Sequence, residues 1–223
     1  MTRAAEMLAR LNPSTCRFDM GNGGIPDLTN IDIAGALGMV RNQLGRELMA
    51  VIHWSAAAPG SMDRVRGIMV KRLLDEGATR WRECVDAELR SLTADNEHDV
   101  RAARASHDRA KQRLFASDAG RMMAVVNSAL HEIATPNHCS VCAGRGQIIA
   151  GALVVTCEPC CGSGKRSHST RDRATRIGVN ESQLRRQPGL SGMHDWCVSL
   201  MQSALIDAEL ELRNALSKEE AVA

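Results

Sequence analysis

Aromatic residues are scarce in this chain: they make up 2% of its 223 residues, and tyrosine is absent. Apolar residues nevertheless amount to 44%. A core must therefore consist of leucine, valine, isoleucine, methionine and alanine, because the large rings that fill many protein cores are nearly missing. Glycine and proline are not abundant enough to indicate a low-complexity chain. The length predicts one large domain or two small ones.

Long hydrophobic runs are missing as well. No window approaches the roughly 20 apolar residues of a membrane-spanning helix, and the N-terminus lacks the apolar stretch of a signal peptide. Five of the eight cysteines cluster between residues 139 and 161. This placement favours metal ligation by reduced thiols over a disulfide framework. We therefore expect a cytoplasmic protein with no membrane partner.

A catalytic constellation is also lacking. No Ser/His/Asp or Cys/His arrangement stands out, and the seven histidines are scattered along the chain, so we expect no enzymatic activity. The net charge of +2 does not by itself indicate a class of partner, but the charges are unevenly distributed along the chain. Seven lysines and arginines against two acids lie between Lys165 and Arg186, and this cationic segment is typical of a surface that contacts a polyanion.

The spacing of the apolar residues predicts a mainly α-helical fold. Residues 1–28 contain a helix-breaking run and are expected to form a flexible N-terminal arm. Residues 29–135 are expected to form a helical body. We expect 136–168 to form a small zinc-binding β-hairpin module, inserted before a helix-turn-helix-like segment and a C-terminal helix in 169–223.

Within the helical body, apolar residues at spacings of three and four predict separate helices at 29–51, at 61–76, from Thr79 onward, at 95–113 and at 118–133. The stretch 95–113 is charged and has few large apolar residues, so we expect a solvated helix there. A last helix is expected from Gly192 to Leu216. Two sets of side chains are expected to face the core: Ile33, Leu37, Val40, Leu44, Leu48 and Val51 in the first helix, and Trp81, Val85, Leu89 and Leu92 in the third.

The motif Cys-x-x-Cys-x-Gly-x-Gly occurs twice within 26 residues. Two cysteines three residues apart on a tight turn can both point at one ion, and the glycines allow the backbone to adopt positive φ. The segment 147–156 between the copies is expected to form a β-hairpin, bent at Ala150 and Gly151, that brings the second pair beside the first. Four thiolates close the coordination sphere of one structural zinc ion. The expected ligands are Cys139, Cys142, Cys157 and Cys160.

Other ligand sets remain open at this stage. Cys161 could replace Cys160, although Cys160 keeps the spacing identical in both copies. His138 and His168 flank the module and are alternative ligands. A metal-free reading, with the cysteines as small apolar residues, is the remaining alternative.

Residues 170–187 have the pattern of a helix-turn-helix, with small Ala174 four residues before Gly178 and an apolar Leu184 six residues after it. Asn180 can cap the second helix, with Gln183 at the reciprocal capping-box position. Glutamine reads adenine edges, and arginine reads guanine or contacts phosphate. An amphipathic basic turn that binds nothing is the alternative. The expected DNA-contacting residues are Lys165, Arg166, Arg171, Arg173, Arg176, Ser182, Gln183, Arg185 and Arg186.

Several blocks together resemble the late-gene antitermination Q proteins of lambdoid phages. The specific part is the pair of Cys-x-x-Cys-x-Gly-x-Gly motifs with a helical DNA-binding segment directly after it. The segment 32–39 is similar to an early helical segment of that family, and Ala134-Thr135-Pro136 precedes the cysteines as it does there. The resemblance covers roughly residues 28–223.

The resemblance implies a transcription factor that binds double-stranded DNA at a phage late promoter and loads onto a paused bacterial RNA polymerase that still carries its sigma factor. Such proteins make polymerase read through terminators and affect the nascent RNA indirectly, and here residues 29–135 would contact polymerase. Two other functions stay open. One is a zinc-containing repressor, and the other is a protein-interaction module like the cysteine-rich domain of J-domain chaperones, which carries four such repeats where this chain has two.

Overall fold

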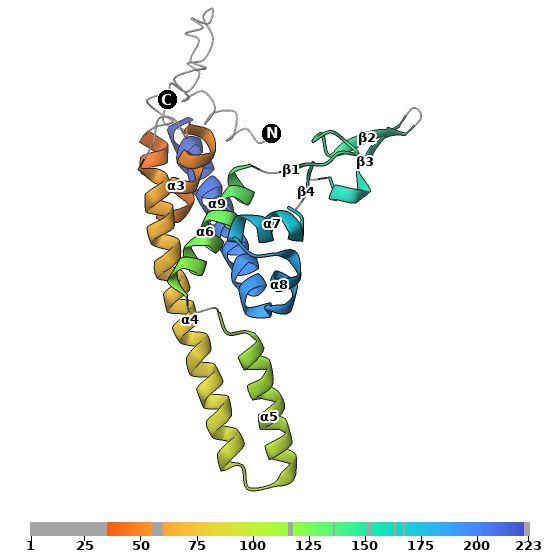
Figure 1. Ribbon diagram of the computed structural model, residues 1–223. Coiled ribbons are helices and arrows are strands. Elements are labelled where there is room, and N and C mark those ends of the chain that lie inside the picture. The colour runs from red at the N-terminus through yellow and green to blue at the C-terminus, as the bar shows by residue number, and fades with distance from the viewer. Residues whose placement is uncertain are drawn as a thin grey trace, which may run out of the picture. The chain divides into compact units, whose positions relative to one another are not determined.

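The computed structural model describes residues 35–54, 60–115, 118–135, 137–150, 153–162, 164–166 and 168–220. The predicted arm at 1–28 and the predicted start of the first helix lie outside these residues. The described part is mainly helical, with the four predicted ligand cysteines in a small β module between helices (Figure 1). The predicted fold class is therefore confirmed.

The elements follow one another along the chain as helices, a short β region and helices again. Their bounds are α3 (Gln43–Trp54), α4 (Ser61–Thr93), α5 (Glu97–Gln112), α6 (Ala119–Ala134), β1 (Asn137–His138), β2 (Gln147–Ala150), β3 (Leu153–Thr156), a 3-10 turn η1 (Glu158–Cys160), β4 (Lys165–Arg166), α7 (Thr170–Ile177), α8 (Glu181–Arg186) and α9 (Pro188–Glu220). The chain divides into two compact units, one of residues 1–68 with 199–223 and the other of residues 69–198. The four predicted metal ligands and the predicted DNA-contacting residues all belong to the second unit.

The first unit has an aliphatic core in which α3 packs on the C-terminal part of α9. The predicted core residues Val40, Leu44, Leu48 and Val51 are buried, which confirms that face. The core continues on α9 with Ala208 and Leu212. A glycine is required at position 45, because a Cβ there would lie 2.1 Å from the carbonyl oxygen of Ala204. The backbone of α9 therefore approaches α3 closely at Gly45.

One predicted helix boundary is wrong in this unit. The expected single helix over 29–51 is interrupted at 39–42 before α3 begins. Asn42 explains the break, since its side-chain oxygen accepts a hydrogen bond from the N–H of Gly45 (3.1 Å) and starts a new helix. The carboxylate of Glu211 accepts from the backbone N–H groups of Arg41 and Asn42, which the break leaves without helical partners.

The predicted break between residues 76 and 79 is also wrong, because α4 is continuous over 33 residues. Glycine at position 77 costs about 1 kcal/mol of helix propensity, which is too little to end a helix. Two local bonds hold the helix across this point. Arg80 pairs with Glu76 at 2.8 Å, and the hydroxyl of Thr79 donates to the carbonyl of Asp75 (3.1 Å).

The side of α4 that faces its neighbour α5 was predicted incorrectly. Trp81 is 61% exposed and Leu92 is 75% exposed, whereas the small residues Cys84 and Ala87 are buried. The reason lies in α5, which offers mainly small and charged side chains and contains no buried residue. α5 confirms the expected solvated helix. Small side chains on both helices let them run alongside each other (Figure 1), and the large apolar side chains of α4 are left outside.

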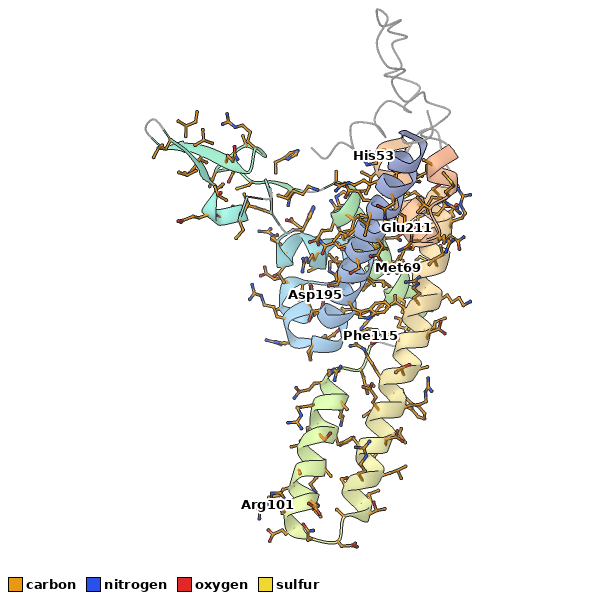
Figure 2. The ribbon with its side chains drawn as sticks, turned by 180° about the vertical axis from the view of Figure 1, so that it is seen from behind. His53, Met69, Arg101, Phe115, Asp195 and Glu211 are labelled. Carbon is orange, nitrogen blue, oxygen red and sulfur yellow. The ribbon has the colours of Figure 1, made fainter. Side chains whose placement is uncertain are left out.

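The core of the second unit joins α6 to the N-terminal part of α9. Val126 and Leu130 on α6 and Met193 on α9 are almost fully buried. α9 begins at Pro188, four residues before the predicted start, because proline fits the first turn of a helix. Phe115, labelled in Figure 2, packs edge-on against Trp196 with ring centroids 5.8 Å apart.

Candidate metal centre and the adjoining helix pair

The cysteine module consists of a stem, two turns and a hairpin. In the stem, β1 and β4 pair antiparallel, with Asn137 opposite Arg166. The predicted hairpin is confirmed as β2 and β3, which pair from Gln147 with Thr156 to Ala150 with Leu153. Sequence reasoning missed the two-residue strands of the stem, because alternation of side chains cannot be recognised over two residues.

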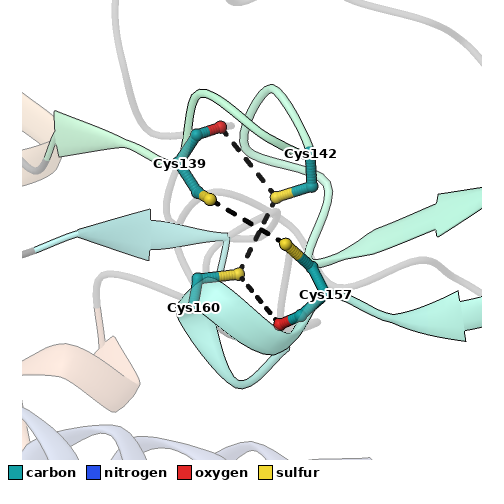
Figure 3. A group of neighbouring side chains, drawn as sticks. All are labelled: Cys139, Cys142, Cys157 and Cys160. Carbon is teal, nitrogen blue, oxygen red and sulfur yellow. Dashed lines mark hydrogen bonds between the residues drawn. The ribbon is translucent and has the colours of Figure 1, made fainter.

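The four predicted ligands converge at the base of the hairpin (Figure 3). Their sulfur atoms all lie within 4.8 Å of one another, and the four side chains are buried. The Sγ atoms of Cys139 and Cys157 are 3.9 Å apart, and those of Cys142 and Cys160 are 3.8 Å apart. None of the four cysteines forms a disulfide. Four sulfurs placed tetrahedrally around one ion at about 2.3 Å would be separated by about 3.8 Å, so the group fits a metal ion.

The two Cys-x-x-Cys turns hold each other through reciprocal backbone bonds. The N–H of Cys157 donates to the carbonyl of Gly146 (2.9 Å), and the N–H of Cys139 donates to the carbonyl of Gly164 (2.8 Å). Each copy of the motif thus ends on a carbonyl that binds the first cysteine of the other copy. The repeat in the sequence therefore produces a nearly symmetric pair of turns around one centre.

Glycine is required at the last position of each motif. Gly146 has φ 75° and Gly164 has φ 69°, both in the left-handed region that favours glycine. A Cβ at Gly146 would lie 2.2 Å from the carbonyl oxygen of Gly162, and one at Gly164 would lie 2.2 Å from that of Gly144. The N–H of Gly146 also donates to the Sγ of Cys142 (3.2 Å), as expected for a backbone group that supports a metal-bound thiolate.

The electrostatics of the thiols favour a cation at the centre. A hydrogen bond from the backbone of Cys142 lowers the pKa of Cys139 to about 7, whereas burial raises the pKa of Cys157 to about 12. A buried group of four sulfurs therefore cannot ionise fully by itself, because charge in a buried site is unfavourable unless it is paired. A divalent ion held by the four sulfurs would supply that pairing. Four protein ligands leave no open coordination position, so such a site is structural.

The alternative ligands do not join the group. Cys161 is exposed and has left-handed φ 48°, which directs the chain away after Cys160. The imidazole of His168 donates to the backbone carbonyl of Thr135 (3.0 Å). His138 is exposed and lies over Gly144. The structure therefore brings together the four cysteines that share the repeated spacing.

The helix pair that follows confirms the local structure predicted from the turn residues. Gly178 ends α7 with φ 80°, and the N–H of Val179 donates back to the carbonyl of Ala174 (3.0 Å). Asn180 caps α8, and its capping box with Gln183 is complete. Ala174 and Leu184 are buried where the two helices meet. The pair thus has the short first helix, left-handed glycine and capped second helix of a helix-turn-helix.

Most of the predicted DNA-contacting side chains are exposed. On α8 and the adjacent end of α7, the exposed residues are Arg176, Ser182, Gln183, Arg185 and Arg186, and nearer the stem they are Lys165, Arg166 and Arg171. Arg185 is held by Glu181 on the next turn of the helix, at 2.6 Å. The side-chain oxygen of Gln183 likewise accepts from the N–H of Asn180 (3.0 Å). The exposed surface of α8 therefore includes two side chains, Gln183 and Arg185, that already have partners within the helix pair.

Arg173 differs from the other predicted contacts because it is only partly exposed and its guanidinium binds residues of two other helices. It donates to both carboxylate oxygens of Glu132, at 2.9 and 2.7 Å, and to Asp195 at 3.0 Å. These bonds tie α7 to α6 and α9. The structure thus gives Arg173 a role in packing the helix pair.

A buried polar group beside this ion pair was not found by sequence reasoning. The Nε2 atom of His194 lies 3.2 Å from the Ser128 hydroxyl and 3.8 Å from Glu132, while its Nδ1 atom has no partner among the described residues. Burial lowers the pKa of His194 to about 4, with Arg173 contributing in the same direction. The imidazole is therefore neutral at pH 7. In the sequence, the one signal for a buried His194 is its helical spacing from apolar residues of α9 such as Leu190 and Cys197.

Comparisons with known proteins add no relative to these observations. No family model, no curated protein and no solved structure matches this chain. None of the helices in the described part of the chain combines the length and apolar character needed to span a bilayer.

Proposed function

We propose that this protein is a DNA-binding transcription antitermination factor whose cysteine module holds one structural zinc ion. The observation that carries the proposal is that a four-cysteine centre is followed directly by a helix-turn-helix-like pair. The second helix of this pair leaves Gln183, Arg185 and Arg186 exposed. Zinc is the ion that four thiolates in tetrahedral geometry most commonly bind. The ion would fix the stem, and α8 would present base-reading side chains.

The size of the helix pair supports a second partner besides DNA. α8 has six residues, so it offers little surface for high affinity by itself. The exposed side chains Trp81, Leu89 and Leu92 give α4 an apolar surface of the kind that contacts another protein. We assign this surface to RNA polymerase, in line with the resemblance to phage late-gene antitermination proteins. DNA at a late promoter would place the factor beside a paused polymerase that retains its sigma factor.

A transcription assay on a template with a late promoter and a downstream terminator tests the proposed function. Purified protein and bacterial RNA polymerase should give full-length RNA beyond the terminator. Loss of the transcript at the promoter would favour the alternative, a zinc-containing repressor. A protein that neither binds the template nor changes transcription would contradict both.

One observation favours a protein-interaction module as the second candidate. Ile149, Leu153 and Val154 on the β2–β3 hairpin are 76%, 69% and 65% exposed. No charged residue lies between Gln147 and Thr156, so this hairpin suits an apolar partner better than a nucleic acid. Capture of unfolded client protein by the hairpin, without any binding to DNA, would support this candidate.

A further inference from the structure

A cleft of about 740 Å³ lies between the stem of the cysteine module and the helix pair. Asn137, His138 and Arg166 line it from the stem, and Arg171 and Arg185 line it from the helices. A single water molecule takes about 30 Å³ in the liquid, so the cleft can hold a much larger polar ligand. We name it the stem cleft.

The charges of the stem cleft favour an anion. Its three guanidinium groups belong to Arg166, Arg171 and Arg185, and all three side chains are exposed. Of the two carboxylates in the lining, Glu181 pairs with Arg185 at 2.6 Å. Asp172 accepts from the neutral hydroxyl of Ser169 at 2.6 Å and keeps its charge, so three guanidinium groups outweigh two carboxylates in the lining. Among the described residues, neither Arg166 nor Arg171 forms an ion pair with a carboxylate. Two guanidinium groups on opposite walls are thus left to meet an anion.

The two walls are fixed to each other by bonds that lie outside the cluster of sulfurs. Asn137 pairs with Arg166 across the stem, and the imidazole of His168 donates to the carbonyl of Thr135 at 3.0 Å, which joins the base of the stem to the end of α6. α6 in turn holds α7 through the ion pair of Glu132 with Arg173. A ligand in the cleft would therefore meet a prearranged surface, which limits the entropic cost of binding.

We propose that the stem cleft seats the sugar–phosphate backbone of one DNA strand, with the stem on one side of the strand and α8 on the other. The inference rests on the proposed function and extends it, since it makes Asn137, His138 and Ser140 contacts to DNA. Their amide, imidazole and hydroxyl groups suit phosphate and sugar oxygens. The cysteine module then contributes directly to DNA affinity.

Salt-dependent binding of the full-length, metal-loaded protein tests this inference. The probe is a mixed-sequence duplex of 30 base pairs, titrated over a range of KCl concentrations. Arg166→Ala and Arg171→Ala should each weaken binding about three- to tenfold and make the slope of log K against log salt shallower by about 0.9. Arg101→Ala is the control, because Arg101 is also exposed but lies near the tip of the α4–α5 hairpin (Figure 2). It should change neither value. Asn137→Ala should weaken binding about two- to threefold without changing the slope, because it removes no charge.

The possible results separate this inference from the proposed function. If the unaltered protein binds DNA but Arg166→Ala and Arg171→Ala keep its affinity and slope, the stem cleft is not the site, although DNA binding stands. If the unaltered protein fails to bind the duplex, both proposals fall. If the two variants lose affinity for single-stranded RNA and keep that for duplex DNA, the cleft holds RNA and the inference is overturned. Unchanged melting temperature and metal content of the variants show that the changes are local.

Discussion

The cysteine module and the helix pair beside it are small regions that become ordered in different ways. Apart from its cysteines, the module has no large buried side chain among its described residues. Of the large aliphatic residues of its hairpin, only Ile148 is partly buried, where it packs against the cysteines, and the others are exposed. The helix pair buries Ile177 and Leu184, is capped by Ser169 and Asn180, and is tied to its neighbours by Arg173. The comparison teaches that an ion can replace a hydrophobic core where the chain supplies four ligands. A helix pair without such ligands depends on its neighbours.

The largest expected difference between the two regions follows from removal of one ligand. Cys142→Ser should release the metal and disorder the module, because structural zinc contributes about 10–16 kcal/mol to the folding of small zinc modules. The helical content should stay nearly unchanged. Elemental analysis and amide hydrogen exchange over residues 137–166 measure the two effects. Cys161→Ser is the control and should keep both metal and protection; an equal effect of the two variants would contradict the ligand set.

On the helical side, the largest effect should come from the ion pair that holds α7. Arg173→Ala leaves Glu132 without its partner, and Glu132 has a side chain only 10% exposed. We expect a loss of about 3 kcal/mol in the free energy of unfolding, since an uncompensated buried charge is costly. Arg185→Ala removes a surface pair with Glu181 and should cost less than about 1 kcal/mol. Urea denaturation measures both, and equal losses would show that Arg173 has no special role in packing.

A pH-dependent effect of intermediate size should arise from His194. Its folded-state pKa of about 4 lies below the ordinary value of 6.5, so the unfolded chain takes up its proton first. The contribution of His194 to the free energy of unfolding is therefore fully present above pH 6.5. It falls as the pH drops and stops falling near pH 4. We expect a loss of about 2 kcal/mol between pH 7 and pH 5 from this group. His194→Gln should lose correspondingly less over the same range in urea denaturation; an identical loss would contradict the pKa assignment.

The smallest effects should separate a glycine that avoids a clash from one that only permits positive φ. Gly178 has φ 80° and open space around it, so Gly178→Ala should cost about 1 kcal/mol from backbone strain alone. Gly146 has a similar φ but a carbonyl in the way. Gly146→Ala should therefore also lower metal affinity, by about tenfold or more. Thermal melting measures the loss of stability in both variants, and metal titration measures the affinity for the ion. Equal metal affinities of Gly146→Ala and the unaltered protein would show that the turn at Gly146 can shift to accommodate a Cβ.

Much of the fold and of the candidate site follows from the sequence, for local reasons. The four ligands, the hairpin and the cap at Asn180 depend on residues close together in the chain. The outward face of α4 was missed because the orientation of an amphipathic helix depends on what its neighbour offers. The small side chains of α5 left Trp81 outside. The partners of Arg173, which come from α6 and α9, likewise depend on contacts between distant segments.

The most direct test of the central claim is a titration of metal-free, fully reduced protein with cobalt(II), whose absorption reports ligand type and geometry. The account predicts saturation at one ion per chain, with the spectrum of a tetrahedral site of four thiolates, and displacement of cobalt by one equivalent of zinc. Saturation at another stoichiometry, or a spectrum without the thiolate bands, would contradict the claim that four cysteines hold one structural ion.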